Sequence, residues 1–366
     1  MAGLAHHAPP QLLPRPADAV AQRWLKGLWG FALAVFVAAL ALRPLDETDV
    51  FFRLATGQQV LQRHALVRHN LFSFTHPNQP YFDSAWLFDV GAALLFRSGG
   101  FAGLVAAKTA WLVGVFVGAF ALARRKGATP GVAAVVLAAA ALVVEPRIVE
   151  RPHLLSFGFA LATLAVVHAT RKRAIWVASV APLVALWANL HAGAFVAPLL
   201  FTAAAVGAFV DRRWKRGERT PAAGPGKLLL AALAAAIALL ATPFGAGIFR
   251  YLGFHVGIHA IHPVDEFRPP DLHSDLPFWI AFATTAVVMG AWARRLPVSW
   301  RDWLPVLVVA ALACRYVRFA ADFALLSAPV VAARVTALLK AAPRVGQERR
   351  WSVAVPAVVA AVASLA

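Results

Sequence analysis

Long apolar runs constrain this chain more than any other feature of its sequence. Eleven of them are candidates for membrane spans, at about 28–43, 101–122, 130–145, 154–170, 174–190, 193–210, 226–243, 276–293, 302–314, 319–338 and 351–366. A helix needs about 20 mostly apolar residues to cross the hydrocarbon core of a bilayer. Hydrophobic residues make up 60% of the chain and charged residues 14%, which argues against a soluble or disordered protein. We therefore predict an all-α, polytopic membrane protein with about eleven transmembrane helices.

Basic residues are concentrated in alternate loops of this arrangement. The loops on one side hold 21 Lys and Arg against 5 acidic residues, whereas the opposite loops hold 11 of each. The positive-inside rule then makes residues 1–27 a cytoplasmic segment, followed by a single transmembrane domain at 28–366. The formal net charge of +18 follows from this topology. Because the basic loops are short and lack a recognisable binding module, no nucleic-acid partner is expected.

Two loops on the non-cytoplasmic side are long, at about 44–100 and 244–275. The first contains two apolar stretches, 50–62 and 85–96, that are too short to span a bilayer. In the first stretch the apolar residues fall on one helical face, so we predict helices lying along the membrane surface. The single cysteine, Cys314, excludes an intrachain disulfide and a cysteine-based metal site.

An acidic cluster follows the first apolar run. Asp46, Glu47 and Asp49 place three carboxylates within four residues at a membrane boundary. Mutual repulsion and lost hydration there favour a proton acceptor, a cation ligand or a contact with a polar substrate. The alternative is an ordinary solvated helix cap. Farther along, Asp83 and Trp86 stand among aromatic residues that suit either a sugar-binding surface or interfacial anchoring.

Basic side chains also gather at the predicted external ends of later spans. They are Arg147, Arg151 and His153 near spans three and four, and Arg315 and Arg318 near spans nine and ten. Arginine forks bind phosphate well at such boundaries. The alternative is that they pair with nearby acids, namely Glu145, Glu150 or Asp322. His191, between two short spans, is a candidate substrate-binding or catalytic residue, with a packed polar loop residue as its alternative.

Several of these strings, taken in order, resemble a known family. They are Asp46-Glu47, the string 49–57 (DVFFRLATG), Phe72-Ser73-Phe74-Thr75, Trp86-Leu87, the string 150–154 (ERPHL), the string 187–193 (WANLHAG), the string 242–245 (TPFG) and the string 266–270 (EFRPP). Asp46-Glu47 resembles the Asp-Glu motif in the first external loop of GT-C glycosyltransferases. The other strings resemble those of a large set of bacterial multi-span proteins. Arg53 stands where those proteins commonly have His.

The resemblance implies an integral membrane enzyme that takes a sugar from a polyprenyl-phosphate donor. Asp49 or Asp46 would then remove the proton of the acceptor hydroxyl, with Glu47 beside them, and external arginines would bind the departing phosphate. The lipid-linked donor and membrane lipids are the implied partners. The implied location is the bacterial inner membrane, with the active face periplasmic. The sequence predicts no oligomeric state.

Sugar transfer of this kind does not require a metal ion, because the carrier phosphate is already a good leaving group. Whether a divalent cation takes part is left open. His255, His259 and His262 recur at helical spacing, which fits a zinc site or a solvated loop. Two other functions are open: a protein that binds or transports a lipid-linked glycan, and a structural membrane subunit. The spans are nearly bare of charge apart from Lys108 and Asp322, which favours chemistry at the surface.

Overall fold

The computed structural model describes residues 16–45, 47–76, 79–168, 178–214, 224–257, 265–293 and 298–341. Regular secondary structure in these residues is entirely helical, which confirms the predicted all-α class. The elements are α1 (Pro16–Ala41), α2 (Asp49–Arg63), α3 (Trp86–Arg125), α4 (Pro130–Val144), η1 (Glu145–Arg147), α5 (His153–His168), α7 (Val180–Leu190), η2 (Ala192–Phe195), α8 (Val196–Arg213), α9 (Pro225–Ala238), α10 (Gly247–Gly257), η4 (Asp265–Phe267), α11 (Leu276–Ala293), α12 (Trp300–Arg315), η5 (Val317–Phe319) and α13 (Ala320–Ala341).

Four helical segments of the described chain are long and apolar enough to cross a membrane: Trp86–Arg125, Pro130–Arg147, Ala192–Arg213 and Val317–Ala341. Shorter apolar helices cover Gly27–Ala41, His153–His168, Val180–Leu190, Pro225–Ala238 and Leu276–Ala291. These segments coincide with nine of the predicted runs. A helix of about 16 residues rises only about 24 Å, less than the thickness of the hydrocarbon core. The weakest predicted run, 302–314, forms α12 and belongs to neither group, and 351–366 lies outside the described residues.

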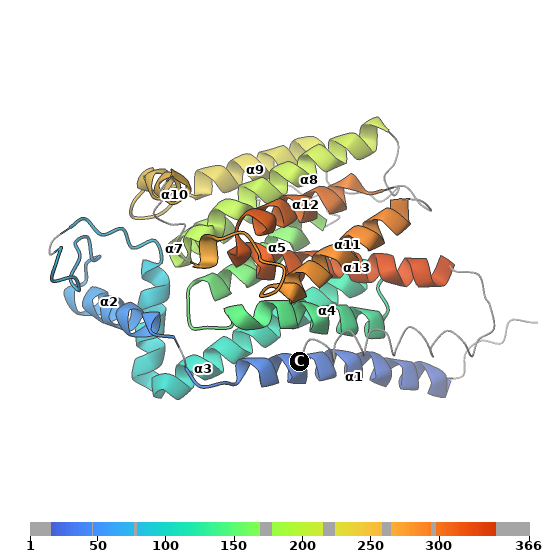
Figure 1. The fold of residues 1–366 in the computed structure, drawn as a ribbon, viewed down its shortest axis with the longest axis horizontal. Coiled ribbons are helices and arrows are strands. Elements are labelled where there is room, and N and C mark those ends of the chain that lie inside the picture. The colour runs from blue at the N-terminus through green and yellow to red at the C-terminus, as the bar shows by residue number, and fades with distance from the viewer. Residues whose placement is uncertain are drawn as a thin grey trace, which may run out of the picture.

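The helices pack side by side around α13 (Figure 1). Within its apolar window 72% of α13 is buried, the largest share of the four long segments. Many of its buried residues are small, among them Ala321, Ala324, Ala328 and Ala332. Small side chains let neighbouring helix backbones approach closely, which is how helices associate where water supplies no hydrophobic drive. α13 is therefore the central helix of the bundle.

The segment α3 consists of two helices that meet at a kink, and each corresponds to a predicted element. The chain turns sharply at Gly100, whose φ of 58° and ψ of −152° suit glycine alone. The predicted surface helix 85–96 is the part before this bend, and the predicted span 101–122 is the part after it. In Figure 1 the first part lies across the end of the bundle beside α2, and α2 corresponds to the other predicted short helix, at 50–62.

The loops gather at two opposite ends of the bundle. At one end are α2, α10 and the short helices η1, η2, η4 and η5 (Figure 1). The strings that the sequence predicts to be external lie in these elements or next to them in the chain. At the other end Asp302 receives the side chains of Lys126 (3.0 Å), His168 (3.2 Å) and Arg334 (3.1 Å). We call the end that carries α2 the loop end. The predicted alternation of loops is thus reproduced as a separation of the two ends.

Candidate functional site

Arg151 is the centre of an ion-pair cluster at the loop end. Its Nε lies 2.7 Å from Glu47 Oε2, its Nη2 lies 3.1 Å from Asp49 Oδ2 and its Nη1 lies 2.5 Å from Glu266 Oε1. The same Glu266 oxygen lies 3.0 Å from Nη1 of Arg147. We call these five residues the Arg151 cluster. It ties the segment after α1, the turn before α5 and η4 to one another, so three distant parts of the sequence meet there.

Of the three predicted catalytic acids, the two that the structure describes differ in their exposure to solvent. The Asp49 side chain is 54% exposed, whereas that of Glu47 is 9% exposed. Glu47 Oε1 also accepts the backbone N–H of Asp49 at 3.1 Å, so Glu47 holds the start of α2 as well as Arg151. Asp46 lies outside the described residues. Of the two described acids, Asp49 is the one that solvent or an acceptor can reach.

Glu266 is held as an anion by its partners. Burial alone would raise its pKa, but the charge and hydrogen bond of Arg147, with the charges of Arg318 and Arg151, lower it below its usual value. Glu266 is therefore ionised at neutral pH. The sequence left open whether Arg147 and Arg151 bind phosphate or pair with Glu145 or Glu150, and both arginines have other acidic partners in the structure. Glu145 pairs with Arg43, Glu150 pairs with Lys108, and the loops bring Glu266, Glu47 and Asp49 to Arg147 and Arg151 instead.

His191 lies between α7 and η2 and is part of a hydrogen-bonded chain. Its Nδ1 is 2.6 Å from Ser156 Oγ, and Trp187 Nε1 donates to that same hydroxyl at 2.7 Å. Burial, followed by the positive charges of Arg318, Arg53 and Arg147, lowers the pKa of His191 to about 3. His191 is therefore neutral at physiological pH. The three arginines come from η5, α2 and η1, so their electrostatic fields converge on one region of the loop end.

Arg53 has two carboxylate partners where α2 meets α3. Its Nη1 lies 3.4 Å from Asp89 and 3.7 Å from Asp83. Asp83 is 1% exposed and accepts the backbone N–H of Ala85, and burial raises its pKa against the opposing effects of that bond and of Arg53. Trp86 Nε1 donates to Asn189 Oδ1 at 2.8 Å. The predicted substrate-binding residues Asp83 and Trp86 thus make internal contacts that attach the first loop to the bundle.

The remaining predicted phosphate-binding residues differ in whether their N–H groups are available to a ligand. His153 Nε2 is 2.9 Å from the carbonyl of Arg147, so this ring nitrogen is already engaged. Arg315 is exposed and its guanidinium stands over the Tyr316 ring, 5.6 Å from the centroid. Arg318 stands over the Phe267 ring at 4.7 Å, and within the described residues its guanidinium makes neither an ion pair nor a hydrogen bond. Among these candidates, Arg318 has N–H groups available at the region of converging charge.

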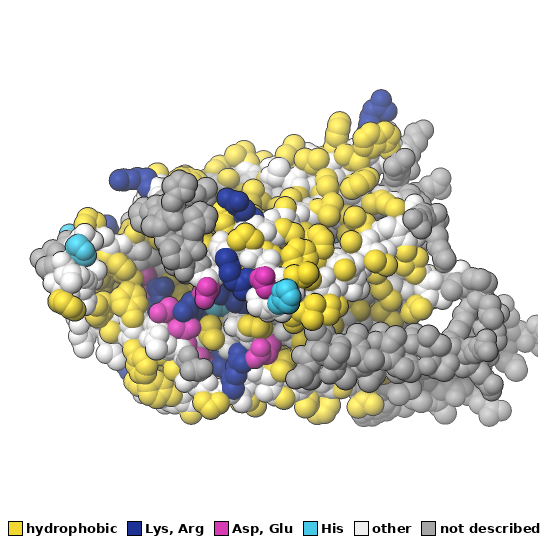
Figure 2. All heavy atoms as spheres, viewed as in Figure 1, with side chains coloured by type: hydrophobic (Ala, Val, Ile, Leu, Met, Phe, Trp, Pro, Cys, Tyr) yellow, Lys and Arg dark blue, Asp and Glu magenta, His cyan; other side chains and the backbone are white. Residues whose placement is uncertain are grey.

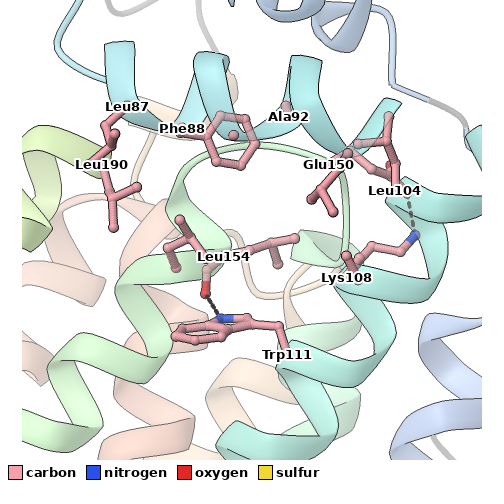
Figure 3. Close-up of a pocket in the computed structure, with 13 residues that line it drawn as sticks. Leu87, Phe88, Ala92, Leu104, Lys108, Trp111, Glu150, Leu154 and Leu190 are labelled. Atoms are coloured by element: carbon pink, nitrogen blue, oxygen red, sulfur yellow. Dashed lines mark hydrogen bonds and ion pairs between the residues drawn. The ribbon is translucent and has the colours of Figure 1, made fainter. Parts of the chain in front are cut away.

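Charged side chains of both signs are visible on the surface near η4, whereas much of the surface over the helices is hydrophobic (Figure 2). Behind the loop end, an apolar cavity of about 180 Å³ lies between the two parts of α3, the start of α5 and the end of α7 (Figure 3). Its lining includes Phe88, Gly91, Leu104 and Leu154. Most of its lining residues are apolar.

The cavity wall carries one buried ion pair. Lys108 Nζ lies 2.6 Å from Glu150 Oε1, and the two side chains are only 3% and 6% exposed. Glu150 precedes Arg151 in the chain, so the wall of the cavity leads directly into the Arg151 cluster. An apolar space and a charged site are therefore neighbours at this end of the molecule.

Sequence reasoning missed Ser156, Trp187 and Glu266 as members of the site. Ser156 is a lone hydroxyl within an apolar run, and Gly193 follows His191 by two residues. A Cβ at Gly193 would lie 2.6 Å from His191 Nδ1 and 2.9 Å from Ser156 Oγ, so this glycine was a signal of close packing. Among the described residues, no group of three or more His, Cys, Asp or Glu is placed to hold a metal ion. The predicted stripe of His255, His259 and His262 lies outside the described side chains.

The helical bundle, with its surface helices and charged loop end, has a GT-C-type glycosyltransferase fold. Among solved structures, it is similar to the archaeal oligosaccharyltransferase AglB from Archaeoglobus fulgidus in complex with an inhibitory peptide and a dolichol-phosphate. The TM-score is 0.59 at 14% identity, over 93% of this chain and 55% of that one. A second structure, the Archaeoglobus fulgidus oligosaccharyltransferase in the apo form, matches with a TM-score of 0.55 at 14% identity, over 87% and 51%.

The chain therefore spans about half the length of the oligosaccharyltransferases it matches. At this level of identity the similarity shows the fold. No protein-family model matches the sequence, and no curated protein does.

Proposed function

We propose that the protein transfers a sugar from a polyprenyl-phosphate-linked donor to an acceptor at the non-cytoplasmic face of a membrane. The observation that carries this proposal is the position of Asp49. Its exposed carboxylate is held by Arg151 at the loop end of a GT-C-type bundle, near a region where three arginine charges converge. A base beside an anion-binding region is what a direct displacement from a lipid phosphate requires.

The proposed reaction is a single displacement at the anomeric carbon. Asp49 accepts the proton of the acceptor hydroxyl as its oxygen forms a bond to that carbon. The bond between the anomeric carbon and the phosphate oxygen breaks, and the electron pair leaves with the phosphate. Arg318, whose guanidinium makes no direct ion pair or hydrogen bond within the described residues, stabilises the growing negative charge. Arg151 and Glu47 position Asp49.

We place the carrier chain of the donor in the apolar cavity. Its lining is suited to isoprene units, and Glu150 in its wall adjoins the Arg151 cluster. The similar archaeal enzyme was solved with a dolichol-phosphate, which is a carrier of this chemical kind. A chain in the cavity would present its phosphate to the loop end.

We further propose that the chain crosses the bacterial inner membrane about eleven times, with its N-terminus cytoplasmic and the loop end periplasmic. The excess of basic residues in the loops of the opposite end supports this orientation. The four long apolar segments and the shorter apolar helices supply candidates for the spans. A short helix can be accommodated by local thinning of the bilayer or by flanking residues that reach the interface.

A second candidate is a protein that binds or transports a lipid-linked glycan without chemistry. The buried Lys108–Glu150 pair favours it, because ionisable residues inside a membrane often mark a transport path. Turnover separates the two functions. The purified protein alone is given a panel of polyprenyl-phosphate sugars together with a panel of hydroxyl acceptors, and released polyprenyl phosphate and glycosylated acceptor are measured. Release above the rate without protein supports transfer; binding of the same lipids with no release supports the second candidate.

A further inference from the structure

The contacts of His191 determine which of its ring nitrogens carries the proton. The backbone N–H of Gly193 donates to Nδ1 at 3.2 Å, and a backbone N–H can only donate. Nδ1 must therefore be the unprotonated nitrogen that accepts. Because Nδ1 carries no hydrogen, the Ser156 hydroxyl, 2.6 Å away, also donates to it, while the Ser156 oxygen accepts the indole N–H of Trp187. In a neutral imidazole the proton then sits on Nε2.

The Nε2–H group itself is free to meet a ligand. It has no hydrogen-bond partner within the described part of the chain. It is also absent from the buried side-chain nitrogens that lack a partner, so it is accessible to solvent. Three arginines, Arg318, Arg53 and Arg147, act electrostatically on the ring, and His153 is within the same range. A positive field combined with a neutral N–H donor suits an anion.

The packing around His191 leaves little freedom for the ring. A Cβ at position 193 would come within 2.6 Å of Nδ1 and 2.9 Å of Cε1, so only glycine permits this arrangement. Trp187 is 1% exposed and Ser156 is 6% exposed, so the two residues that are hydrogen-bonded in series with His191 are held in the core. An N–H held in this way needs little reorganisation to bind a ligand, which is the condition for strong electrostatic stabilisation.

We propose that His191 is a neutral imidazole that offers its Nε2–H, together with the guanidinium of Arg318, to the phosphate of the lipid-linked donor. This inference rests on the proposed function. Ser156 and Trp187 are then positioning residues, because they act on the substrate only through the ring of His191. The ligand class is a phosphate ester whose negative charge increases as the sugar departs.

The competing explanation is that His191 is only a helix cap. It precedes η2, and its side chain accepts the N–H of Gly193 as an N-cap residue does. Asparagine separates the two explanations. Its side-chain oxygen can cap the same N–H, since Asn is a favoured N-cap residue, but its shorter side chain does not replace Nε2–H.

The binding experiment uses the full chain in lipid nanodiscs with farnesyl phosphate as the probe and farnesol as its phosphate-free counterpart. We expect His191→Asn and Arg318→Gln each to raise the Kd of farnesyl phosphate by about tenfold to a hundredfold, the cost of a lost hydrogen bond to a charged group. Farnesol binding should not change. Arg97→Gln is the matched control, because Arg97 is an exposed arginine on the first part of α3. Wild-type affinity in His191→Asn, or no preference of the wild type for farnesyl phosphate, overturns the proposal.

The protonation state of the His191 ring can be measured independently of turnover. Nitrogen-15 spectra of ring-labelled histidine are compared between the wild type and His191→Asn, so that the difference isolates His191. We expect an unprotonated Nδ1 and a protonated Nε2 at pH 7 and at pH 5.5, and the same tautomer in Ser156→Ala, because the Gly193 N–H still donates to Nδ1 there. A proton on Nδ1, or an imidazolium at pH 7, overturns the proposal. A protein that passes both tests but never releases polyprenyl phosphate refutes the proposed transfer and leaves the phosphate site standing.

Discussion

Glu47 and Asp49 are two residues apart, yet their surroundings give them different tasks. Glu47 is almost fully buried and binds both Arg151 and the backbone of α2, whereas Asp49 shares Arg151 but keeps more than half of its side chain exposed. A residue that must exchange a proton with an acceptor has to be reachable. A residue that must hold a guanidinium in place is better buried, because a buried ion pair is less screened. The geometry therefore separates the base from its support.

Glu266 allows a test of the Arg151 cluster by pH. Its pKa is lowered in the folded protein, so its ionised form stabilises the fold above the unfolded pKa of about 4.3 and this contribution is lost as pH falls through the lower folded value. Glu266→Gln should lower the thermal midpoint by several degrees at pH 7, and its difference from the wild type should shrink below about pH 4. Asp265→Asn, at the exposed neighbouring position, is the control. A pH-independent difference would mean that the carboxylate charge is not what stabilises the cluster.

At the scale of elements, the crossing of α2 over α3 positions the site. Gly57 lets the two helices touch, since a Cβ at this position would lie 2.0 Å from the backbone oxygen of Asp89 and 3.0 Å from Ala93 Cβ. Arg53, one helical turn earlier, pairs with Asp83 and Asp89 across the same contact. Asp49 begins the same helix, so any separation of the helices moves the carboxylate.

Gly57→Ala should accordingly reduce transfer and lower the thermal midpoint together. The added methyl group would overlap the backbone oxygen of Asp89. Because backbone cannot rotate away as a side chain can, the two helices must move apart. We expect a destabilisation of roughly 1–3 kcal/mol, typical of overpacking. Gly114→Ala in the second part of α3 is the matched control, because nothing lies within 4 Å of its added Cβ. Equal melting curves for the two variants would contradict a tight crossing at Gly57.

The apolar cavity allows a test of where the polyprenyl chain of the donor binds. An added Cβ at Gly91 meets no atom within 4 Å, and Gly91 lines the cavity, so a larger side chain there has open space to fill. Gly91→Leu should raise the KM for a donor on a long polyprenyl chain severalfold and change its kcat little, because uniform binding is lost. Initial rates with long-chain and short-chain donors of the same sugar measure this. An unchanged KM for the long chain would remove the cavity from the donor site.

For the whole molecule, the separation of loops into two ends predicts which residues face which compartment. Phe74 at the loop end is 92% exposed and Trp214 at the opposite end is 58% exposed. In a Cys314→Ala background, Phe74→Cys should react with a membrane-impermeant thiol reagent applied to the outside, and Trp214→Cys should react only after the cytoplasmic side is opened. The reverse pattern would invert the orientation and place the site away from an external lipid-linked donor.

Much of this architecture could be predicted from the apolar runs, because a helix in a membrane must satisfy its backbone internally and its length is bounded. The runs coincide with the observed helices, and the external strings meet at one end. Ion-pair partners could not be predicted in the same way. Glu145 and Glu150 are close to Arg147 and Arg151 in sequence, but the fold brings Glu266 to them from more than a hundred residues away. The division of α3 at Gly100 was predicted, because the sequence analysis ended one short helix before this residue and began a span after it.

The measurement that tests the central claim most directly is turnover by Asp49→Asn. The amide keeps the size of the carboxylate but cannot accept the proton, so release of polyprenyl phosphate by the purified variant should fall by about 10²–10⁴-fold. The thermal midpoint should change little, because an exposed ion pair contributes at most about 1 kcal/mol. Asp46→Asn is the control for the neighbouring candidate. Near-normal turnover in Asp49→Asn with loss in Asp46→Asn would move the base to Asp46, and normal turnover in both would contradict base catalysis by this acidic cluster.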